Sequence, residues 1–299
     1  MSKEHPIIVV TGSSGAGTTS VRHAFEHIFT RLEILPAIVE GDSFHRYSRL
    51  DMREQIAIHE RAGEKFSHFS AKANLLQELQ NLFKEYAQLG TGSFRHYIHD
   101  QDESRKSGYP CGTFTPWTAY PPNTDLMFYE GLHGAAKTDS VDIGKYADLI
   151  IGTVPVINLE WIQKIHRDTE ERGYKRDTVT DTILRRMHDY IHMITPQFSR
   201  TDINFQRVPT VDTSNPFIAR DVPSPDESMV VIRVNDPRKF SVDFPYLLAM
   251  IHNSFMSRRN NIVIPGAKLG LAMEIIFMPI IEKLMIIKKQ MTLQKQFDD

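Results

Sequence analysis

The chain contains 299 residues, of which 41% are hydrophobic and 24% charged, and its 35 basic and 37 acidic side chains give a formal net charge of −2. This composition is typical of a globular protein, and the near balance of charge excludes a broad basic surface for nucleic acid. A single cysteine, Cys111, excludes an internal disulfide and is typical of a reducing compartment. Charged residues and Pro279 interrupt the most apolar late segment, residues 271–287, so we expect no membrane span. The sequence thus predicts a cytoplasmic protein that binds neither nucleic acid nor a membrane.

Strand and helix patterns alternate along the first two thirds of the chain. Residues 6–10 (PIIVV) form a continuous apolar run, typical of a strand buried on both faces of a parallel sheet. After a glycine-rich stretch, apolar side chains from Val21 to Leu32 recur at helical spacing. Such alternation predicts an α/β doubly wound, mainly parallel sheet with ligands at the carboxyl ends of its strands.

The remaining elements follow from the same patterns. Further strands are predicted at residues 36–42, 124–131, 147–156, 228–234 and 260–266. Helices are predicted at residues 73–89, 159–173 and 180–194, and from residue 268 onward. Residues 91–124 are rich in Gly, Pro, Ser and charge, which predicts a surface excursion.

The glycine-rich stretch GSSGAGTTS resembles a phosphate-binding loop, G-x-x-x-x-G-K-[ST], except that Thr18 stands at the lysine position. A bare glycine turn is the alternative, but a strand before the loop and a helix after it favour an anion site built from backbone N–H groups. Thr19 would then supply a hydroxyl to Mg²⁺. Phosphoryl transfer requires charge neutralisation, so another residue must replace the missing lysine. The predicted ATP- and phosphate-binding residues are Gly12, Ser13, Ser14, Gly15, Ala16, Gly17, Thr18, Thr19 and Ser20.

Two carboxylates end predicted strands. Asp42 follows IVEG and Glu130 follows LMFY, so both would lie beside the glycine loop if their strands are central. One carboxylate would hold Mg²⁺ and the other would accept the proton of an attacking hydroxyl. A helix cap or a turn acid is the alternative for either residue taken alone.

Basic residues occur in two further segments. Lys164, Arg167 and Asp168 share one face of a predicted helix, and Arg172 follows one turn later. A solvated, salt-bridged face is the alternative, but these cations could replace the absent loop lysine. His45 and Arg49 closely follow Asp42, a pattern that suits a phosphorylated acceptor. The pair His96 and His99 has metal-like spacing but no further partner nearby, which disfavours zinc.

The segments VTGSSGAGTTS, EGDSFHR, FYEGLHG, VPVINLEWIQKIHRD and NFQRVPTVDTSNPF resemble the bacterial phosphoribulokinase family over nearly the whole chain. That family also has threonine at the loop lysine position, as at Thr18. The resemblance implies a P-loop kinase fold in which residues 1–299 form one domain. It also implies a lid at about residues 159–200 and a C-terminal strand and helix extension at about residues 228–299.

The resemblance further implies ATP- and Mg²⁺-dependent phosphorylation of the 1-hydroxyl of D-ribulose 5-phosphate, a Calvin cycle reaction. On this analogy Asp42 is the catalytic base and Glu130 lies near Mg²⁺, and the sugar phosphate is held by His45, Arg49 and Arg172. The lid over ATP would carry Lys164, Arg167 and Asp168. Many family members are homo-oligomers that NADH activates and AMP inhibits, and the matching allosteric arginines are Arg186, Arg233 and Arg258.

Two other functions compete with this interpretation. A nucleoside kinase of the uridine kinase type shares the RDxxxRG pattern at residues 167–173, but usually keeps the loop lysine and a D-H-P motif that this sequence lacks. A non-catalytic, nucleotide-sensing regulator would need to have lost the base or the metal acid, whereas Asp42 and Glu130 are both present.

Overall fold

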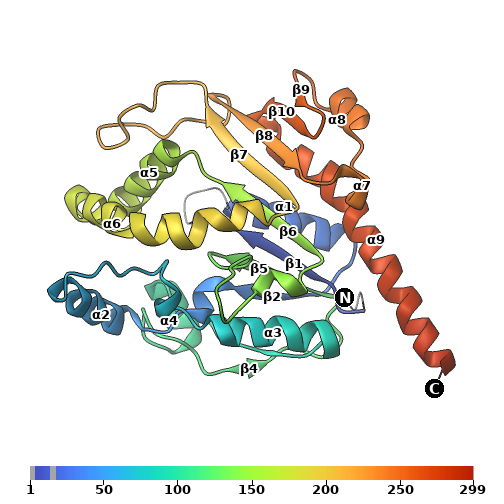
Figure 1. Ribbon diagram of the computed structural model, residues 1–299, viewed down its shortest axis with the longest axis horizontal. Coiled ribbons are helices and arrows are strands. Elements are labelled where there is room, and N and C mark those ends of the chain that lie inside the picture. Colours follow the sequence, from blue (N-terminus) through green and yellow to red (C-terminus); the bar gives the residue numbers. More distant parts are fainter. Residues whose placement is uncertain (1–3, 14–17, 299) are drawn as a thin grey trace.

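A mixed eight-stranded sheet organises the protein, with strand order β2-β5-β1-β6-β7-β8-β10-β9. The computed structural model describes residues 4–13 and 18–298, apart from the side chains of residues 18–20, 171 and 295–298 (Figure 1). The sheet strands are β1 (Ile7–Thr11), β2 (Pro36–Glu40), β5 (Leu126–Gly131), β6 (Leu149–Val154), β7 (Ile203–Pro209), β8 (Ser228–Val234), β9 (Phe255–Arg258) and β10 (Asn261–Pro265). A separate two-stranded sheet pairs β3 (Ser93–Phe94) with β4 (Thr118–Ala119).

The first five strands of the order, from β2 to β7, are parallel, and β8, β10 and β9 continue the sheet in antiparallel fashion. β1 lies between β5 and β6, so the segments that follow these three strands meet at one edge of the sheet. The predicted α/β fold with a mainly parallel sheet, late strands and a C-terminal helix is therefore confirmed.

Helices cover both faces of this sheet (Figure 1). They are α1 (Thr18–Arg31), α2 (Arg49–Arg61), α3 (Leu76–Leu89), α4 (Gln101–Ser107), α5 (Ile157–His166), α6 (Arg176–Asp189), α7 (Pro237–Phe240), α8 (Phe244–Met250) and α9 (Leu269–Asp298). α3 ends at Gly90, which adopts the left-handed conformation (φ 67°) that favours glycine at a helix end. The long helix α9 continues through Pro279, and its C-terminal part projects from the body of the molecule (Figure 1).

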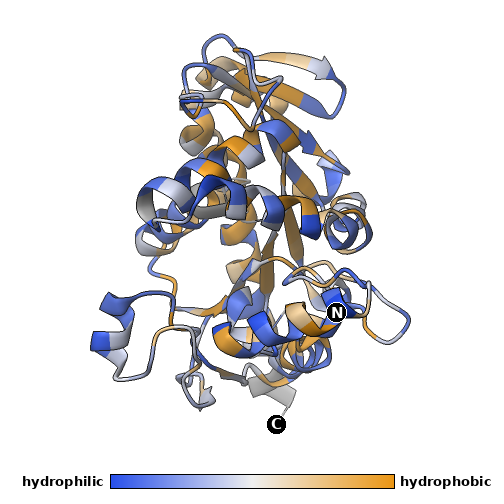
Figure 2. Cartoon of the chain, turned by 90° about the vertical axis from the view of Figure 1, so that its left-hand side faces the viewer, coloured by the Kyte–Doolittle hydropathy of each residue, from blue (hydrophilic) through white to orange (hydrophobic). Residues whose placement is uncertain are grey.

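β1 shows how the sequence produces two cores. All five of its residues are buried, because the strand has a packed layer on each face. Ile8 and Val10 belong to the core that α1 and α9 cover, whereas Ile7 and Val9 belong to the core that α3 covers. The sheet accordingly forms an apolar layer between more hydrophilic helices (Figure 2). Among the described residues, no helix combines the length and the apolar character that a membrane span requires.

Several predicted elements differ from the structure in their bounds, helix type or place in the sheet. The segment 159–173 is not one α-helix, because α5 ends at His166 and a π-helical turn, η4 (Arg167–Glu171), follows it. Similarly, α6 begins before residue 180 and gives way to a second π-helical turn, η5 (Tyr190–Ile194). β2 is an edge strand rather than a central one, and it ends before Asp42, which lies in the 3₁₀ turn η1 (Gly41–Phe44). The alternating strand β7 and the helix α2 were not predicted.

Candidate functional site

The first part of the site is the point where β1 leaves the sheet. Gly12 N donates a hydrogen bond to the Gly131 carbonyl oxygen at 3.2 Å, which ties the end of β1 to the end of β5. A Cβ atom at residue 12 would lie 1.8 Å from Thr153 Oγ1 on β6, so only glycine fits between these strand ends. The chain then continues through Ser13, whose side chain is fully buried, toward α1.

The rest of the predicted phosphate loop falls largely beyond what the structure describes. Ser14, Gly15, Ala16 and Gly17 lie outside the described residues, as do the side chains of Thr18, Thr19 and Ser20. The backbone of residues 18–20 forms the first turn of α1. A strand before the loop and a helix after it is the context that a phosphate loop requires.

Carboxylates gather beside this loop at the ends of β2 and β5. Glu40 and Glu130 are register partners on these neighbouring parallel strands. Arg22, on α1, lies 2.8 Å from Glu40 and 4.0 Å from Glu130, measured from its Nη1 atom to the nearest carboxylate oxygen. The sequence interpretation identified Glu130 but missed Glu40 and Arg22, because only the strand pairing shows that they meet.

A strongly charged cavity of about 650 Å³ lies farther along the same edge of the sheet. Its walls come from α2 on one side and from α5, η4 and α6 on the other, and Figure 1 shows these two groups of helices on the same side of the molecule. We call it the charged cavity; its lining residues include Asp42, His45, Arg49, Arg53, His68, Tyr97, His99, Lys164, Arg167, Asp168, Arg172, Asp181, Arg185 and Arg186. All seven residues predicted as catalytic or substrate-binding are therefore together, although the chain separates them by more than a hundred positions.

Asp42 and His45 form a close pair in this cavity. His45 Nε2 lies 3.1 Å from Asp42 Oδ1, and His99 Nε2 lies 3.7 Å from Asp42 Oδ2. Desolvation would raise the pKa of Asp42, but the charge and hydrogen bond of His45, followed by the charge of His99, lower that pKa below its usual value. Conversely, burial would lower the pKa of His45, but Asp42 raises it above the usual value. Asp42 is therefore ionised at neutral pH.

Arg49 is held by a segment that was predicted to be a surface excursion. Its backbone N–H donates to the Gly112 carbonyl oxygen at 2.8 Å, and its guanidinium donates to the His99 carbonyl oxygen at 2.7 Å and to Cys111 Sγ at 3.2 Å. Residues 91–124 are thus a wall of the charged cavity as well as surface. No sequence pattern indicates this contact, because it joins positions that lie far apart in the chain.

Three cations, Lys164 on α5, Arg167 in η4 and Arg172 directly after η4, meet around the carboxylate of Asp168. Asp168 accepts from Lys164 Nζ, and its Oδ1 atom lies 3.2 Å from both Arg167 Nε and Arg172 Nη1. Burial lowers the pKa of Lys164 to about 8, assisted by the repulsion of Arg186 and opposed by Asp168. Three cations on a single carboxylate leave net positive charge that faces the cavity.

The three predicted allosteric arginines do not lie together within the chain. Arg186, on α6, lines the charged cavity, where its guanidinium lies 5.1 Å from the Phe69 ring centroid and burial lowers its pKa to about 10. Arg233 and Arg258 are exposed on β8 and β9, where both are register partners of Asn261 in β10. Arg233 and Arg258 therefore lie on the two strands that flank β10, at the far end of the strand order from β2.

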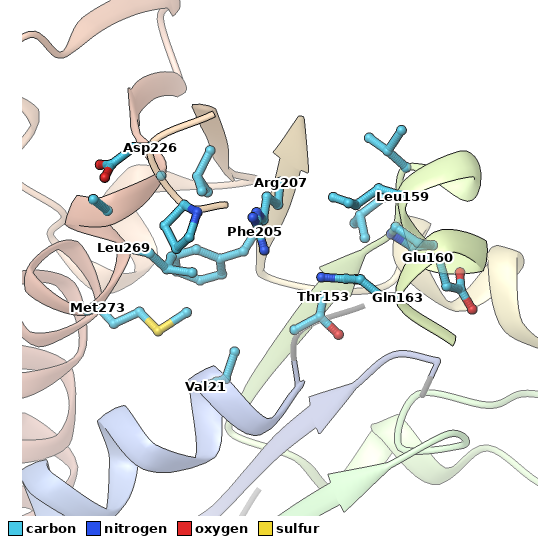
Figure 3. Close-up of a pocket in the computed structure, with 18 residues that line it drawn as sticks. Val21, Thr153, Leu159, Glu160, Gln163, Phe205, Arg207, Asp226, Leu269 and Met273 are labelled. Carbon is cyan, nitrogen blue, oxygen red and sulfur yellow. The ribbon is translucent and has the colours of Figure 1, made fainter. Parts of the chain in front are cut away.

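A second cavity, of about 460 Å³, lies beside α1 on the other side of α5 (Figure 3). We call it the apolar cavity; its lining residues include Val21, Val154, Pro155, Leu159, Gln163, Phe205, Arg207, Asp226, Leu269 and Met273. Arg207 Nε donates to Ser228 Oγ at 3.0 Å, and burial lowers the pKa of this arginine. Figure 3 shows Arg207 near Phe205, where α5, β7 and the start of α9 meet. No motif in the sequence indicated this cavity.

Mg²⁺ prefers a few hard oxygen ligands together with substrate phosphates. Glu130 supplies carboxylate oxygens of this kind next to the start of α1, and the nearby Arg22 shows that the position attracts a cation. The described residues contain no cluster of three or more His, Cys, Asp or Glu side chains that could hold a metal by themselves. A single carboxylate such as Glu130 fits a metal ion that takes its other ligands from substrate phosphates and water.

Comparisons with known proteins agree with this geometry. A family model described as phosphoribulokinase / uridine kinase family matches residues 7–214, more than half of the chain. The chain is 60% identical over 291 residues to a phosphoribulokinase of Nitrobacter vulgaris, an alignment that covers 97% of this chain and all of the relative. It is 61% identical to a phosphoribulokinase of Xanthobacter flavus, with 97% and 99% of the two chains covered. The solved structure of phosphoribulokinase from Rhodobacter spheroides superposes with a TM-score of 0.88 at 54% identity, covering 96% of this chain and all of the other.

Proposed function

We propose, since the chain belongs to the phosphoribulokinase / uridine kinase family, that it transfers the γ-phosphoryl group of ATP to the 1-hydroxyl of D-ribulose 5-phosphate. One observation carries this proposal most directly. The carboxylate of Asp42 lies in a cavity whose other charged groups are mostly cations, next to the loop that follows β1. Such a cavity suits a small phosphorylated acceptor better than a neutral nucleoside.

Asp42 is the proposed general base for the attacking hydroxyl. Its position in the turn after β2 places it beside the strand ends that carry the phosphate loop and Glu130. On the opposite wall, Lys164 and Arg167 replace the absent loop lysine by stabilising the charge on the transferred phosphoryl group. Asp168 holds these two side chains in place through its ion pairs.

Arg49 and Arg172 are the proposed ligands of the phosphate group of the acceptor, and His45, whose Nε2 atom faces Asp42, is the proposed substrate contact beside the reacting hydroxyl. Arg49 is anchored through contacts with His99 and Cys111, which leave part of a bidentate donor set for an anion. Arg172 reaches the same cavity from the position directly after η4, so a bound sugar phosphate would bridge its two walls.

The nucleotide binds, in this proposal, between the phosphate loop and the apolar cavity. Val21, which follows the first turn of α1, lines that cavity, so phosphates at the start of α1 would direct the base toward it. Apolar walls and the Arg207 guanidinium suit a flat aromatic base. Thr19 and Glu130 would hold Mg²⁺, which neutralises phosphate charge when it is bound.

Regulation and assembly belong to the same proposal. NADH and AMP are the proposed effectors, with Arg233 and Arg258 contacting their phosphates at the sheet edge and Arg186 transmitting the effect from the charged cavity. The protein would be a cytoplasmic homo-oligomer that acts in the Calvin cycle. Support for these points comes from the family resemblance.

A coupled assay of ADP release tests the proposal. The purified protein is supplied with ATP, Mg²⁺ and either ribulose 5-phosphate, ribose 5-phosphate or uridine, each with and without NADH. We expect turnover with ribulose 5-phosphate alone among these acceptors, increased by NADH. Turnover only with uridine would establish the nucleoside kinase alternative, and no turnover with any acceptor would support the regulator.

A further inference from the structure

The buried amide of Asn74, just before α3, has one possible orientation. Its Nδ2 atom donates to the carbonyl oxygens of His68 at 2.8 Å and Ser70 at 2.7 Å, which uses both of its N–H groups. A flipped amide would direct its oxygen at these two carbonyl oxygens, which cannot donate. Asn74 is only 2% exposed, so water cannot relieve such a clash. Its Oδ1 atom therefore faces His45.

This orientation fixes the protonation of one ring nitrogen of His45. Asn74 Oδ1 lies 2.8 Å from His45 Nδ1, and since an amide oxygen only accepts, Nδ1 must carry a hydrogen. The other ring nitrogen, Nε2, lies 3.1 Å from Asp42 Oδ1. Any proton that the ring gains or loses is therefore the one on Nε2, between His45 and Asp42.

We infer that Asn74 is a positioning residue that fixes the tautomer of His45, so that Asp42 and His45 act as one base that shares a single proton between Oδ1 and Nε2. This inference rests on the proposed role of Asp42 in phosphoryl transfer. In the active form Asp42 is ionised and His45 is neutral, with its hydrogen on Nδ1.

The proton balance of the transfer step follows from this arrangement. The acceptor oxygen forms a bond to the γ-phosphorus while the bond from that phosphorus to the β,γ-bridging oxygen breaks. The hydroxyl proton moves to Asp42 and is then shared with His45 Nε2, and the electron pair of the broken P–O bond leaves with ADP. The hydrogen between His45 and Asn74 does not move.

Without the Asn74 oxygen, a neutral His45 would place its hydrogen on Nε2 and donate it to Asp42. That tautomer stabilises the unprotonated pair and makes it a weaker base. With Asn74 in place, the lone pair of Nε2 instead faces the carboxylate, and their repulsion is relieved when a proton arrives. Asn74 thus increases the basicity of the pair, in agreement with its contribution to raising the pKa of His45.

The neighbouring titratable groups do not supply the increase in basicity that Asn74 gives to the pair of Asp42 and His45. Among the described residues, those that act on Asp42 or His45 are His68, Tyr97, His99, Tyr129, His133 and Arg186. Burial lowers the pKa of His68 well below its usual value and that of His133 to about 4, so both rings are neutral at pH 7. Arg186 remains charged and opposes protonation of His45.

Nitrogen NMR of the intact enzyme tests the tautomer without any turnover. The 13 histidines are labelled with ¹⁵N in the ring, and the His45 signals are assigned by their loss in His45→Gln. We expect neutral His45 to keep its hydrogen on Nδ1, and the Nε2 signal alone to move strongly as the ring titrates. A neutral ring with its hydrogen on Nε2 would overturn the inference, whereas the proposed function would stand or fall by the ADP-release assay.

A pair of variants tests the effect on catalysis. Asn74→Leu keeps a similar shape but removes the acceptor, so we expect the acid limb of the kcat–pH profile to move down by about one pH unit, the size that loss of a hydrogen bond to a charged group produces. Ser70→Ala is the matched control, because it removes a contact to Lys72 N in the same segment and keeps the carbonyl that binds Asn74. An equal fall in kcat at every pH, with an unmoved acid limb, would show that Asn74 is merely structural. If Asn74→Leu does not fold, the NMR measurement on the unsubstituted enzyme decides.

Discussion

The charged cavity and the apolar cavity lie on opposite sides of α5, and the same helix supplies residues to both. Gln163 lines the apolar cavity, whereas the next residue, Lys164, lines the charged one. Neighbouring residues on a helix point about 100° apart, so a single helix can separate two chemically different compartments. In the proposed function, the acceptor and the nucleotide would therefore be recognised by different forces, and α5 would connect their two sites.

Asp42→Asn should have the largest effect, because it removes the base from the charged cavity while keeping its shape. We expect kcat to fall ~10²–10⁴-fold with little change in either KM. Steady-state kinetics with ribulose 5-phosphate provides the measurement. Asp181→Asn, at the exposed part of the same cavity, is the control and should retain activity. Near-normal turnover by Asp42→Asn would remove Asp42 as the base.

Lys164→Met should come next, because it removes a cation that replaces the absent loop lysine. The expected loss is ~10²–10³-fold in kcat, which is typical when one group that stabilises transition-state charge is deleted. Lys175→Met, on the exposed residue before α6, controls for the general loss of a positive charge. If Lys164→Met leaves kcat unchanged, Lys164 does not supply the cation that the loop lacks.

Arg49→Gln should weaken binding of the substrate assigned to the charged cavity and leave binding of the substrate assigned to the apolar cavity unchanged. We expect KM for ribulose 5-phosphate to rise by ~10–100-fold while KM for ATP stays within about twofold, since a charge-assisted hydrogen bond is worth roughly 1.5–3 kcal/mol. Initial rates at varied concentrations of each substrate provide both constants. Arg61→Gln, at the end of the same helix α2, serves as the matched control. A larger change in KM for ATP would assign Arg49 to the nucleotide.

Arg207→Met should show the reverse pattern in the apolar cavity. An arginine over an aromatic base contributes ~0.5–2 kcal/mol, so KM for ATP should rise by roughly 2–30-fold and KM for the sugar phosphate should not change. Direct titration with ADP measures the same loss without turnover. Lys289→Met, on the distant part of α9, is the control. Unchanged nucleotide affinity would exclude this cavity as the base site.

Raising the pH should have the smallest effect on kcat among these tests. Burial lowers the pKa of Lys164 to about 8, so its positive charge is present below that pH and is lost as pH rises through it. We therefore expect kcat to fall several-fold between about pH 8 and pH 9. Lys164→Arg, which stays charged, should move this alkaline limb upward even if its kcat is lower. An unmoved limb would assign the titration to another group.

The sequence predicted the parts of the site that local patterns encode. The strand before Gly12, the carboxylates at Asp42 and Glu130 and the cations around Lys164 all stand in short motifs whose chemistry is readable. The parallel sheet then brings strand ends together by topology alone. This explains how residues from distant segments come to line one cavity.

What the sequence did not predict depends on contacts between distant segments. Tyr97 lines the charged cavity and Cys111 contacts Arg49, both from a segment with weak secondary-structure signals. Glu40 meets Arg22 only because β2 pairs with β5. The π-helical turn at Arg167 replaced a predicted α-helix, because no residue pattern marks where the helical hydrogen bonds shift. Asn74 has no motif at all, and its role is visible only in its hydrogen bonds.

One contact across the charged cavity has a consequence for the timing of each catalytic cycle. Arg185, on α6, lies 3.3 Å from Glu60 on α2, so this ion pair joins the two walls, and the Glu60 side chain is 54% exposed. Exposed pairs of this kind contribute only about 0.2–1 kcal/mol and weaken as salt screens them. Thermal motion breaks such a contact readily. In the proposed function, its opening would let a highly charged bisphosphate product leave without disturbing the folded core.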